Sequence, residues 1–169
     1  MIETKRFLLR ELLESDATGM FALDSDPEVH RYLGNNPQTD INQARKVISI
    51  IRKQYTDFGI GRWAVIDRLT QEFVGWAGLK YEQNGRENYK YYDLGYRLRR
   101  KYWGKGIATE VGQTWVKYGF EKLGLEEICA AAHVENLASN KVLIKCGLNF
   151  IETFEYEDIT CNWYSITPH

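Results

Sequence analysis

The chain has 169 residues and a formal net charge of −1 at pH 7. A chain of this length buries about two thirds of its unfolded surface without help from disulfides or metals, so we expect residues 1–169 to form a single domain. The near-neutral charge gives no long-range field for nucleic acid or an anionic membrane. No apolar stretch approaches the roughly 20 residues that cross a bilayer.

The cysteines and histidines indicate neither a disulfide framework nor a metal site. Cys129, Cys146 and Cys161 contain no C-x-x-C pair, so we expect buried free thiols in a reducing cytoplasm. The three histidines share no ligand spacing, so no metal is expected. The charged residues between positions 3 and 11 are unlike a secretory signal, which also favours a cytoplasmic protein.

Residues 6–12 predict an opening strand, and two short helices follow it. Ser15 is the candidate N-cap of the first helix. The pair Asp26-Pro27 starts a second helical turn that runs through Tyr32-Leu33. Residues 34–37 read Gly-Asn-Asn-Pro and predict a loop.

The next pattern predicts a long amphipathic helix from Asp40 to Phe58. Asp40 and Gln43 form a capping box, and Gly59 suits the end of the helix. The apolar residues recur at spacings of three and four, at Ile41, Ala44, Ile48, Ile51, Tyr55 and Phe58.

Three runs rich in aromatic and β-branched residues, at 63–67, 72–81 and 90–98, predict strands. Gly75 and Gly78 interrupt the middle run, which predicts a bulge or a close approach of another backbone.

The rest of the chain alternates between helices and strands. We expect helices at 106–122 and 138–146, and strands at 127–133, 148–156 and 159–166. Antiparallel runs followed by a helix-connected parallel pair predict an α/β fold: a mixed sheet with helices on both faces.

A glycine loop, residues 103–109, joins the third strand-like run to the helix that starts near residue 106. The helix start leaves N–H groups unpaired and carries the positive end of the dipole, so a diphosphate can sit on the backbone at Gly104 and Gly106. The alternative is a plain tight turn. Four nearby cations favour the phosphate, namely Arg99, Arg100, Lys101 and Lys105.

Residues 136–148 carry a second motif, and with the glycine loop it resembles the GNAT superfamily of N-acetyltransferases. The motif reads Asn136-x-x-Ser139, followed by Lys145-x-Gly147-Leu148. Trp103 before Gly-Lys-Gly-x-Ala-Thr-Glu, together with residues 3–10, is similar to the RimJ/RimL-like branch of ribosomal-protein N-acetyltransferases and their relatives.

The resemblance implies an acyl-CoA N-acyltransferase fold and acetyl-CoA as the co-substrate. In that fold the N-terminal sheet is largely antiparallel, and a parallel pair of strands splays apart at the cofactor. The glycine loop would hold the pyrophosphate, and the strand before it would pair with the pantetheine arm. The residues implied in cofactor binding are Leu98, Arg99, Gly104, Lys105, Gly106, Ile107, Ala108, Thr109, Asn136 and Ser139.

The resemblance also implies acetyl transfer to a primary amine by direct attack, through a tetrahedral intermediate. A backbone N–H at Leu98 or its neighbours is the candidate donor to the oxyanion. Asp93 is the candidate base, because a carboxylate among aromatic residues has a raised pKa. The alternatives for Asp93 are that it faces solvent or pairs with a Lys or Arg. Glu110 is a second carboxylate, but the first turn of a helix favours a structural role there.

The acid that protonates the leaving thiolate is less clear, because Leu143 stands where many family members carry a tyrosine. Leucine cannot donate a proton, which leaves water or Ser139. Ser139 could equally be the N-cap of the helix that follows. The missing tyrosine also motivates a second function, a non-catalytic module that binds or senses acyl-CoA without releasing thiol.

The acceptor amine is open between a protein N-terminus, a polyamine, an amino sugar and an antibiotic amine. Residues 11–28 hold six carboxylates and no Lys or Arg, so they either attract a cationic amine or form a solvated acidic face. Neither nucleic acid nor a membrane is expected as a partner, and a homodimer is left open.

Overall fold

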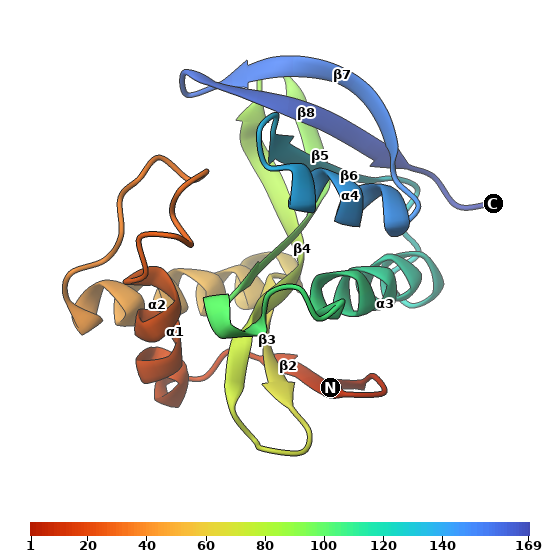
Figure 1. The fold of residues 1–169 in the computed structure, drawn as a ribbon. Helices are drawn as coiled ribbons and strands as arrows, with labels where there is room; N and C mark the ends of the chain where they lie inside the picture. Colours follow the sequence, from red (N-terminus) through yellow and green to blue (C-terminus); the bar gives the residue numbers. More distant parts are fainter.

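An eight-stranded mixed sheet runs through the whole chain, and the computed structural model describes residues 1–169 (Figure 1). The strand order is β1-β2-β3-β4-β5-β6-β8-β7, and only β5 and β6 pair in parallel. The strands are β1 (Ile2–Glu3), β2 (Phe7–Glu11), β3 (Arg62–Asp67), β4 (Phe73–Arg86), β5 (Tyr89–Leu98), β6 (Ile128–His133), β7 (Asn149–Tyr156) and β8 (Ile159–Ile166). The predicted α/β fold with a mixed sheet is confirmed.

Four α-helices and two 3-10 helices connect these strands. The α-helices are α1 (Ala17–Asp24), α2 (Ile41–Phe58), α3 (Ile107–Glu121) and α4 (Leu137–Lys145), and the 3-10 helices are η1 (Glu14–Asp16) and η2 (Arg100–Tyr102). No helix combines the length and the apolar character needed to span a membrane. All three cysteines are buried free thiols, as expected.

Helix α2 forms as its local signals predict. The Asp40 carboxylate accepts a hydrogen bond from the Asn42 N–H at 2.7 Å, and the Gln43 carbonyl oxygen accepts one from the Asp40 N–H at 3.1 Å. Gly59 ends the helix with a φ of +72°, a conformation that glycine adopts without steric cost.

Two predictions in the N-terminal region are wrong. Ser15 caps no helix, because α1 follows directly on η1 and the Asp16 carboxylate binds the Leu13 N–H at 2.8 Å. Residues 26–33 form successive turns instead of a helix. Their hydrogen bonds span three residues, as between the Val29 N–H and the Asp26 carbonyl, because no continuous apolar face holds a longer helix together.

The two glycines of β4 mark the predicted close approaches. Val65 pairs with Gly75 while Ile66 pairs with Phe73, so Val74 is the extra residue of a bulge. A Cβ on Gly75 would lie 2.1 Å from the Arg97 carbonyl oxygen, and one on Gly78 would lie 3.2 Å from the Gly61 carbonyl oxygen. A side chain at Gly75 would overlap the neighbouring strand, and one at Gly78 would be in tight contact with the backbone before β3.

Helices cover both faces of the sheet and define two cores. On the face that we call the α2 face, α1 and α2 pack on β2 and β3, with Met20 and Ile48 against Ala64. On the opposite face, the α3 face, α3 and α4 pack on β3 to β8. The core of that face is built around Trp115, Leu79, Ile128 and Leu143.

The sheet divides between β5 and β6. Their parallel pairing is confined to Asp93 and Cys129, whereas β6 pairs with β8 along its whole length. The last residues of β5, up to Leu98, therefore have a partner strand only on the β4 side. We call this opening the β5–β6 gap. It corresponds to the splayed strand pair that the resemblance implies.

Candidate functional site

The unpaired side of β5 presents backbone groups to the β5–β6 gap. The Arg99 N–H donates to the Val74 carbonyl on the β4 side, at 2.9 Å. Peptide groups alternate in direction along a strand, so those of Leu98 and Tyr96 point toward the gap. The Leu98 carbonyl accepts a hydrogen bond from the Trp103 indole N–H at 2.9 Å. The Leu98 N–H, the candidate oxyanion donor, therefore faces the same opening.

The glycine loop begins where β5 ends, and its backbone is uncovered. Gly104 and Gly106 both have a φ of +72°, in the left-handed region that favours glycine. A Cβ on Gly104 would meet no atom within 4 Å, and one on Gly106 would meet only Arg6 Nη2 at 3.8 Å. Gly106 is the N-cap of α3 and offers no side chain to its free N–H groups. An anion can therefore reach the N–H groups of Ile107, Ala108 and Thr109.

Two of the four cations around the loop form ion pairs, and the other two do not. Arg100 pairs with Asp26 at 3.0 Å, and Lys101 pairs with Glu72 at 3.1 Å. The Arg99 guanidinium donates to the Phe73 carbonyl at 3.1 Å and forms no ion pair. Lys105 also has no carboxylate partner, so it remains the cation closest in sequence to both glycines.

Arg6 adds a cation to the loop that sequence reasoning missed. Its Nη1 donates to the Lys105 carbonyl at 2.9 Å, and its Nε binds Glu110 at 2.8 Å. Glu110 also accepts from the Thr4 hydroxyl at 2.6 Å. Partial burial opposes ionisation, yet these bonds hold the pKa of Glu110 below its usual value. Glu110 therefore joins the N-terminal segment to α3, in keeping with a structural role.

The start of α4 lines the other side of the gap. Asn136 is the N-cap of α4, and its side-chain oxygen accepts from the Ser139 N–H at 3.2 Å. The interpretation of Ser139 as the N-cap is therefore wrong, because Ser139 lies inside the first turn. Its hydroxyl is instead 2.9 Å from the Tyr96 hydroxyl of β5.

Tyr96 is a second polar group in the gap that the sequence did not indicate. Burial raises the pKa of Tyr96, so its phenol stays protonated and can donate a hydrogen bond at neutral pH. Leu143 lies one helical turn after Ser139, is 2% exposed and belongs to the core of the α3 face. Hydroxyl groups therefore reach the gap from β5 and from the first turn of α4, and not from position 143.

Asp93 lies where the parallel pairing ends, and it forms an ion pair with Arg62. Arg62 also donates to the Gly78 carbonyl at 2.6 Å, and its guanidinium stands 5.2 Å from the Trp76 ring. Burial raises the pKa of Asp93, and the positive charge of Arg62 opposes that effect. Among the alternatives for Asp93, the structure shows pairing with an arginine; its role as the base stays a prediction.

Three of the six acidic residues near the N-terminus are paired with arginines. Asp16 pairs with Arg10 at 2.8 Å, Asp24 with Arg97 at 2.7 Å, and Asp26 with Arg100. Glu11, Glu14 and Glu28 remain exposed. The carboxylates nearest the sheet therefore form neither a negative groove nor a solvated acidic face, because arginines from other elements bind them.

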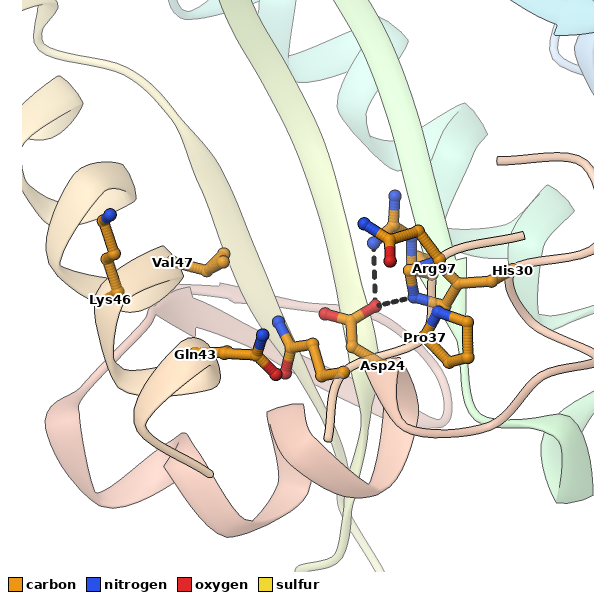
Figure 2. A pocket seen from close by; sticks show the side chains of 9 residues that line it. Asp24, His30, Pro37, Gln43, Lys46, Val47 and Arg97 are labelled. Atoms are coloured by element: carbon orange, nitrogen blue, oxygen red, sulfur yellow. Dashed lines mark hydrogen bonds and ion pairs between the residues drawn. The ribbon is translucent and has the colours of Figure 1, made fainter. Parts of the chain in front are cut away.

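A cavity of about 420 Å³, here named the Arg97 pocket, opens on the α2 face beside the end of β5 (Figure 2). Asp24 Oδ1 accepts hydrogen bonds from Arg97 Nη1 at 2.7 Å and from His30 Nε2 at 3.2 Å. The lining residues are Asp24, His30, Asn36, Pro37, Gln38, Gln43, Lys46, Val47 and Arg97.

Comparison with known proteins places this chain among acetyltransferases. A family model described as an acetyltransferase (GNAT) domain matches residues 6–149. The uncharacterized N-acetyltransferase YoaA of Bacillus subtilis is 33% identical over 172 residues, which cover 98% of this chain and 96% of YoaA.

Two solved structures share the fold over nearly the whole chain. An acetyltransferase (GNAT family) from Bacillus anthracis has a TM-score of 0.82 at 24% identity, covering 98% of this chain and 97% of that one. The spermidine N-acetyltransferase from Vibrio cholerae, solved in complex with CoA and spermine, has a TM-score of 0.78 at 18% identity, covering 97% and 96%.

Proposed function

The chain belongs to the acetyltransferase (GNAT) family, and on that premise we propose that it moves the acetyl group of acetyl-CoA to a primary amine by direct attack. The observation that carries the proposal is the continuity of the β5–β6 gap with the glycine loop. The open strand edge at Leu98 leads directly into the uncovered N-terminus of α3.

The loop and the strand edge divide the binding of acetyl-CoA between them. The N–H groups of residues 104–109 and the positive end of α3 suit the diphosphate, with Lys105 as the free cation. The N–H and C=O groups of Tyr96, on the open edge of β5, suit the amides of the pantetheine arm. Asn136 and Ser139 border the arm from α4.

The reaction requires the loss of a proton from the amine, a negative carbonyl oxygen and a thiolate that leaves. Asp93 lies five residues before Leu98 in a strand that rises about 3.3 Å per residue, so it takes the ammonium proton through a chain of water molecules, and the free amine attacks the acetyl carbon. The Leu98 N–H stabilises the oxyanion of the tetrahedral intermediate. When the C–S bond breaks, the thiolate takes a proton from Ser139, hydrogen-bonded to Tyr96, or from water.

The proposal extends to the RimJ/RimL-like branch and to a cytoplasmic enzyme. The sequence Trp103 before Gly-Lys-Gly supports the branch, and the indole N–H of Trp103 binds the Leu98 carbonyl at the end of β5. A tryptophan at this position thus has a definite role in shaping the gap. A measurement of the mass of the protein in solution would distinguish a monomer from a homodimer.

Release of thiol tests the proposal against a non-catalytic module. Acetyl-CoA is mixed with a panel of primary amines and N-terminal peptides, and free thiol is measured with a thiol-reactive dye. We expect thiol release that requires both protein and amine, with an equal amount of acetylated amine detected by mass spectrometry. Binding of acetyl-CoA without thiol release for any amine would instead favour the sensing module, which the buried Leu143 motivates.

A further inference from the structure

We propose that the Arg97 pocket binds a carboxylate of the acceptor, so that the enzyme acts on small amines that carry a carboxylate, such as amino acids. This inference rests on the proposed acetyl transfer and names its substrate class. It departs from the attraction of a polycation that the acidic N-terminal sequence suggests.

Arg97 is held in place yet keeps most of its hydrogen-bonding capacity. Its guanidinium makes one side-chain hydrogen bond, to Asp24, and lies 5.1 Å from the Trp76 ring. The side chain is 26% exposed. A guanidinium offers several N–H donors in a planar fork that matches a carboxylate. Because Asp24 and Trp76 fix its orientation, Arg97 can receive a carboxylate with little loss of side-chain freedom.

The charges of the pocket favour an anion. Asp24 is 2% exposed, and Arg97 neutralises it. Lys46, from α2, forms no ion pair and leaves the lining with a surplus of positive charge. Figure 2 shows Lys46 and Gln43 on the α2 side of the pocket and Arg97 on the β5 side, with Asp24 between them. A second ammonium of a polyamine would meet repulsion here.

The amide groups of the pocket suit a ligand with both acceptor and donor groups. The Gln43 oxygen is occupied by the N–H groups of Thr39 and Asp40, which leaves the amide N–H groups of Gln43 to donate. The Gln38 side-chain oxygen is buried and has no hydrogen-bond partner. An N–H donor from the ligand would satisfy it. A carboxylate would use the free N–H groups of Gln43, and a donor on the acceptor other than the reacting amine would satisfy Gln38.

The position of Arg97 brings the carboxylate close to the reaction. Arg97 directly precedes Leu98, whose N–H is the candidate oxyanion donor, so the pocket adjoins the open end of β5. The Arg97 side chain points to the α2 face, while the Leu98 peptide faces the gap. An acceptor whose carboxylate binds at Arg97 must therefore be long enough to bring its amine around the edge of β5 to the gap.

The test compares matched acceptors by steady-state thiol release. The acceptors are the standard amino acids, their amides, propylamine and spermidine. We expect kcat/KM for the best amino acid to exceed that of its amide by about tenfold or more, the value of a hydrogen bond to a charged group. Equal values for acid and amide, or spermidine as the best acceptor, would overturn the proposal and leave acetyl transfer intact.

Two variants in the pocket and one control outside it test whether the pocket residues cause the preference for the carboxylate. Lys46→Gln should reduce the preference for the acid severalfold by raising KM, and Arg97→Lys should reduce it further because lysine lacks the planar fork. Lys53→Gln is the control, since Lys53 lies on the same helix but pairs with Asp57 outside the pocket. If Lys53→Gln changes the preference as much as Lys46→Gln, the pocket does not select the carboxylate.

Calorimetry distinguishes failure of this inference from failure of the proposed function. If no amine gives thiol release, the proposed function fails, and titration of amino acids into the protein with coenzyme A then tests the pocket. Heat of binding that weakens in Lys46→Gln would support the carboxylate site. The absence of binding by any amino acid would overturn it.

Discussion

Asp93 and Arg62 form an ion pair at the closed end of the β5–β6 gap. Both side chains are largely buried, at 21% and 11% exposure, so removal of one partner leaves the other charge poorly solvated. Breaking a buried pair in this way typically costs about 3–5 kcal/mol. Any kinetic test of Asp93 must therefore separate the loss of a base from the loss of the pair.

We expect Asp93→Asn to lower kcat by about 10²–10⁴-fold with little change in the affinity for acetyl-CoA, because only the proton transfer is lost. Turnover is measured well below the melting temperature of the variant. Arg62→Met is the matched control, because it breaks the same ion pair and keeps the carboxylate. At a pH above the acid limb of both variants, an equal loss of kcat would assign the effect to the ion pair.

We also expect Arg62→Met to change the pH dependence of kcat. Arg62 favours the ionised form of Asp93, so its removal raises the pKa of Asp93 further. A base acts when deprotonated, so kcat falls as pH drops through that pKa. The acid limb of the pH–rate profile should therefore move to higher pH in Arg62→Met. An unmoved limb would mean that Asp93 is not the titrating base.

Ser139 and Tyr96 can be tested as the hydroxyl pair that serves the leaving thiolate. If they supply the proton, Ser139→Ala and Tyr96→Phe slow turnover more at high pH than at low pH, where solvent protons are abundant. Asn136, and not Ser139, is the cap of α4, so Ser139→Ala should avoid the 0.5–2 kcal/mol that a lost cap costs. A lower melting temperature with an unchanged pH profile would contradict the role in proton transfer.

At the scale of elements, the loop between β5 and α3 allows a sharp comparison of two glycines. Gly106 and Gly124 have φ values of +72° and +65°, and a Cβ would meet no atom closer than 3.8 Å at Gly106 and none within 4 Å at Gly124. Valine at either position costs about 1–3 kcal/mol of backbone strain. The two sites differ because only Gly106 begins α3.

We expect Gly106→Val to weaken coenzyme A binding by at least about tenfold while Gly124→Val leaves it unchanged. The valine side chain at position 106 would occupy the space of the diphosphate. Calorimetry gives the affinities, and thermal melting should show similar destabilisation in both variants. Wild-type affinity in Gly106→Val would show that the loop is a turn and not a phosphate site.

At the scale of the whole molecule, local sequence signals predicted most helices and strands. They failed in segments whose conformation depends on contacts with residues distant in the sequence. The capping box and apolar spacing located α2, and the glycines located the loop at the start of α3. Residues 26–33 lack a continuous apolar face and formed turns, and Tyr32 among them packs its ring against that of the distant His133.

The candidate site shows the same division. The sequence motifs located the loop and the start of α4, because each is a continuous segment. Arg6 and Lys105, Tyr96 and Ser139, and Asp24 and Arg97 are brought together only by the sheet, and nothing in their spacing indicates it. The acidic N-terminal stretch is another example, since Asp16, Asp24 and Asp26 bind arginines that lie outside the stretch.

The most direct test of the account is amide hydrogen exchange with and without acetyl-CoA. The account predicts slower exchange in peptides that cover residues 96–98 and 104–109, where free N–H groups meet the pantetheine arm and the diphosphate. Exchange within α2, which lies away from the gap, should stay unchanged. Protection that is absent from both segments, or that falls elsewhere in the chain, would contradict the placement of acetyl-CoA in the β5–β6 gap.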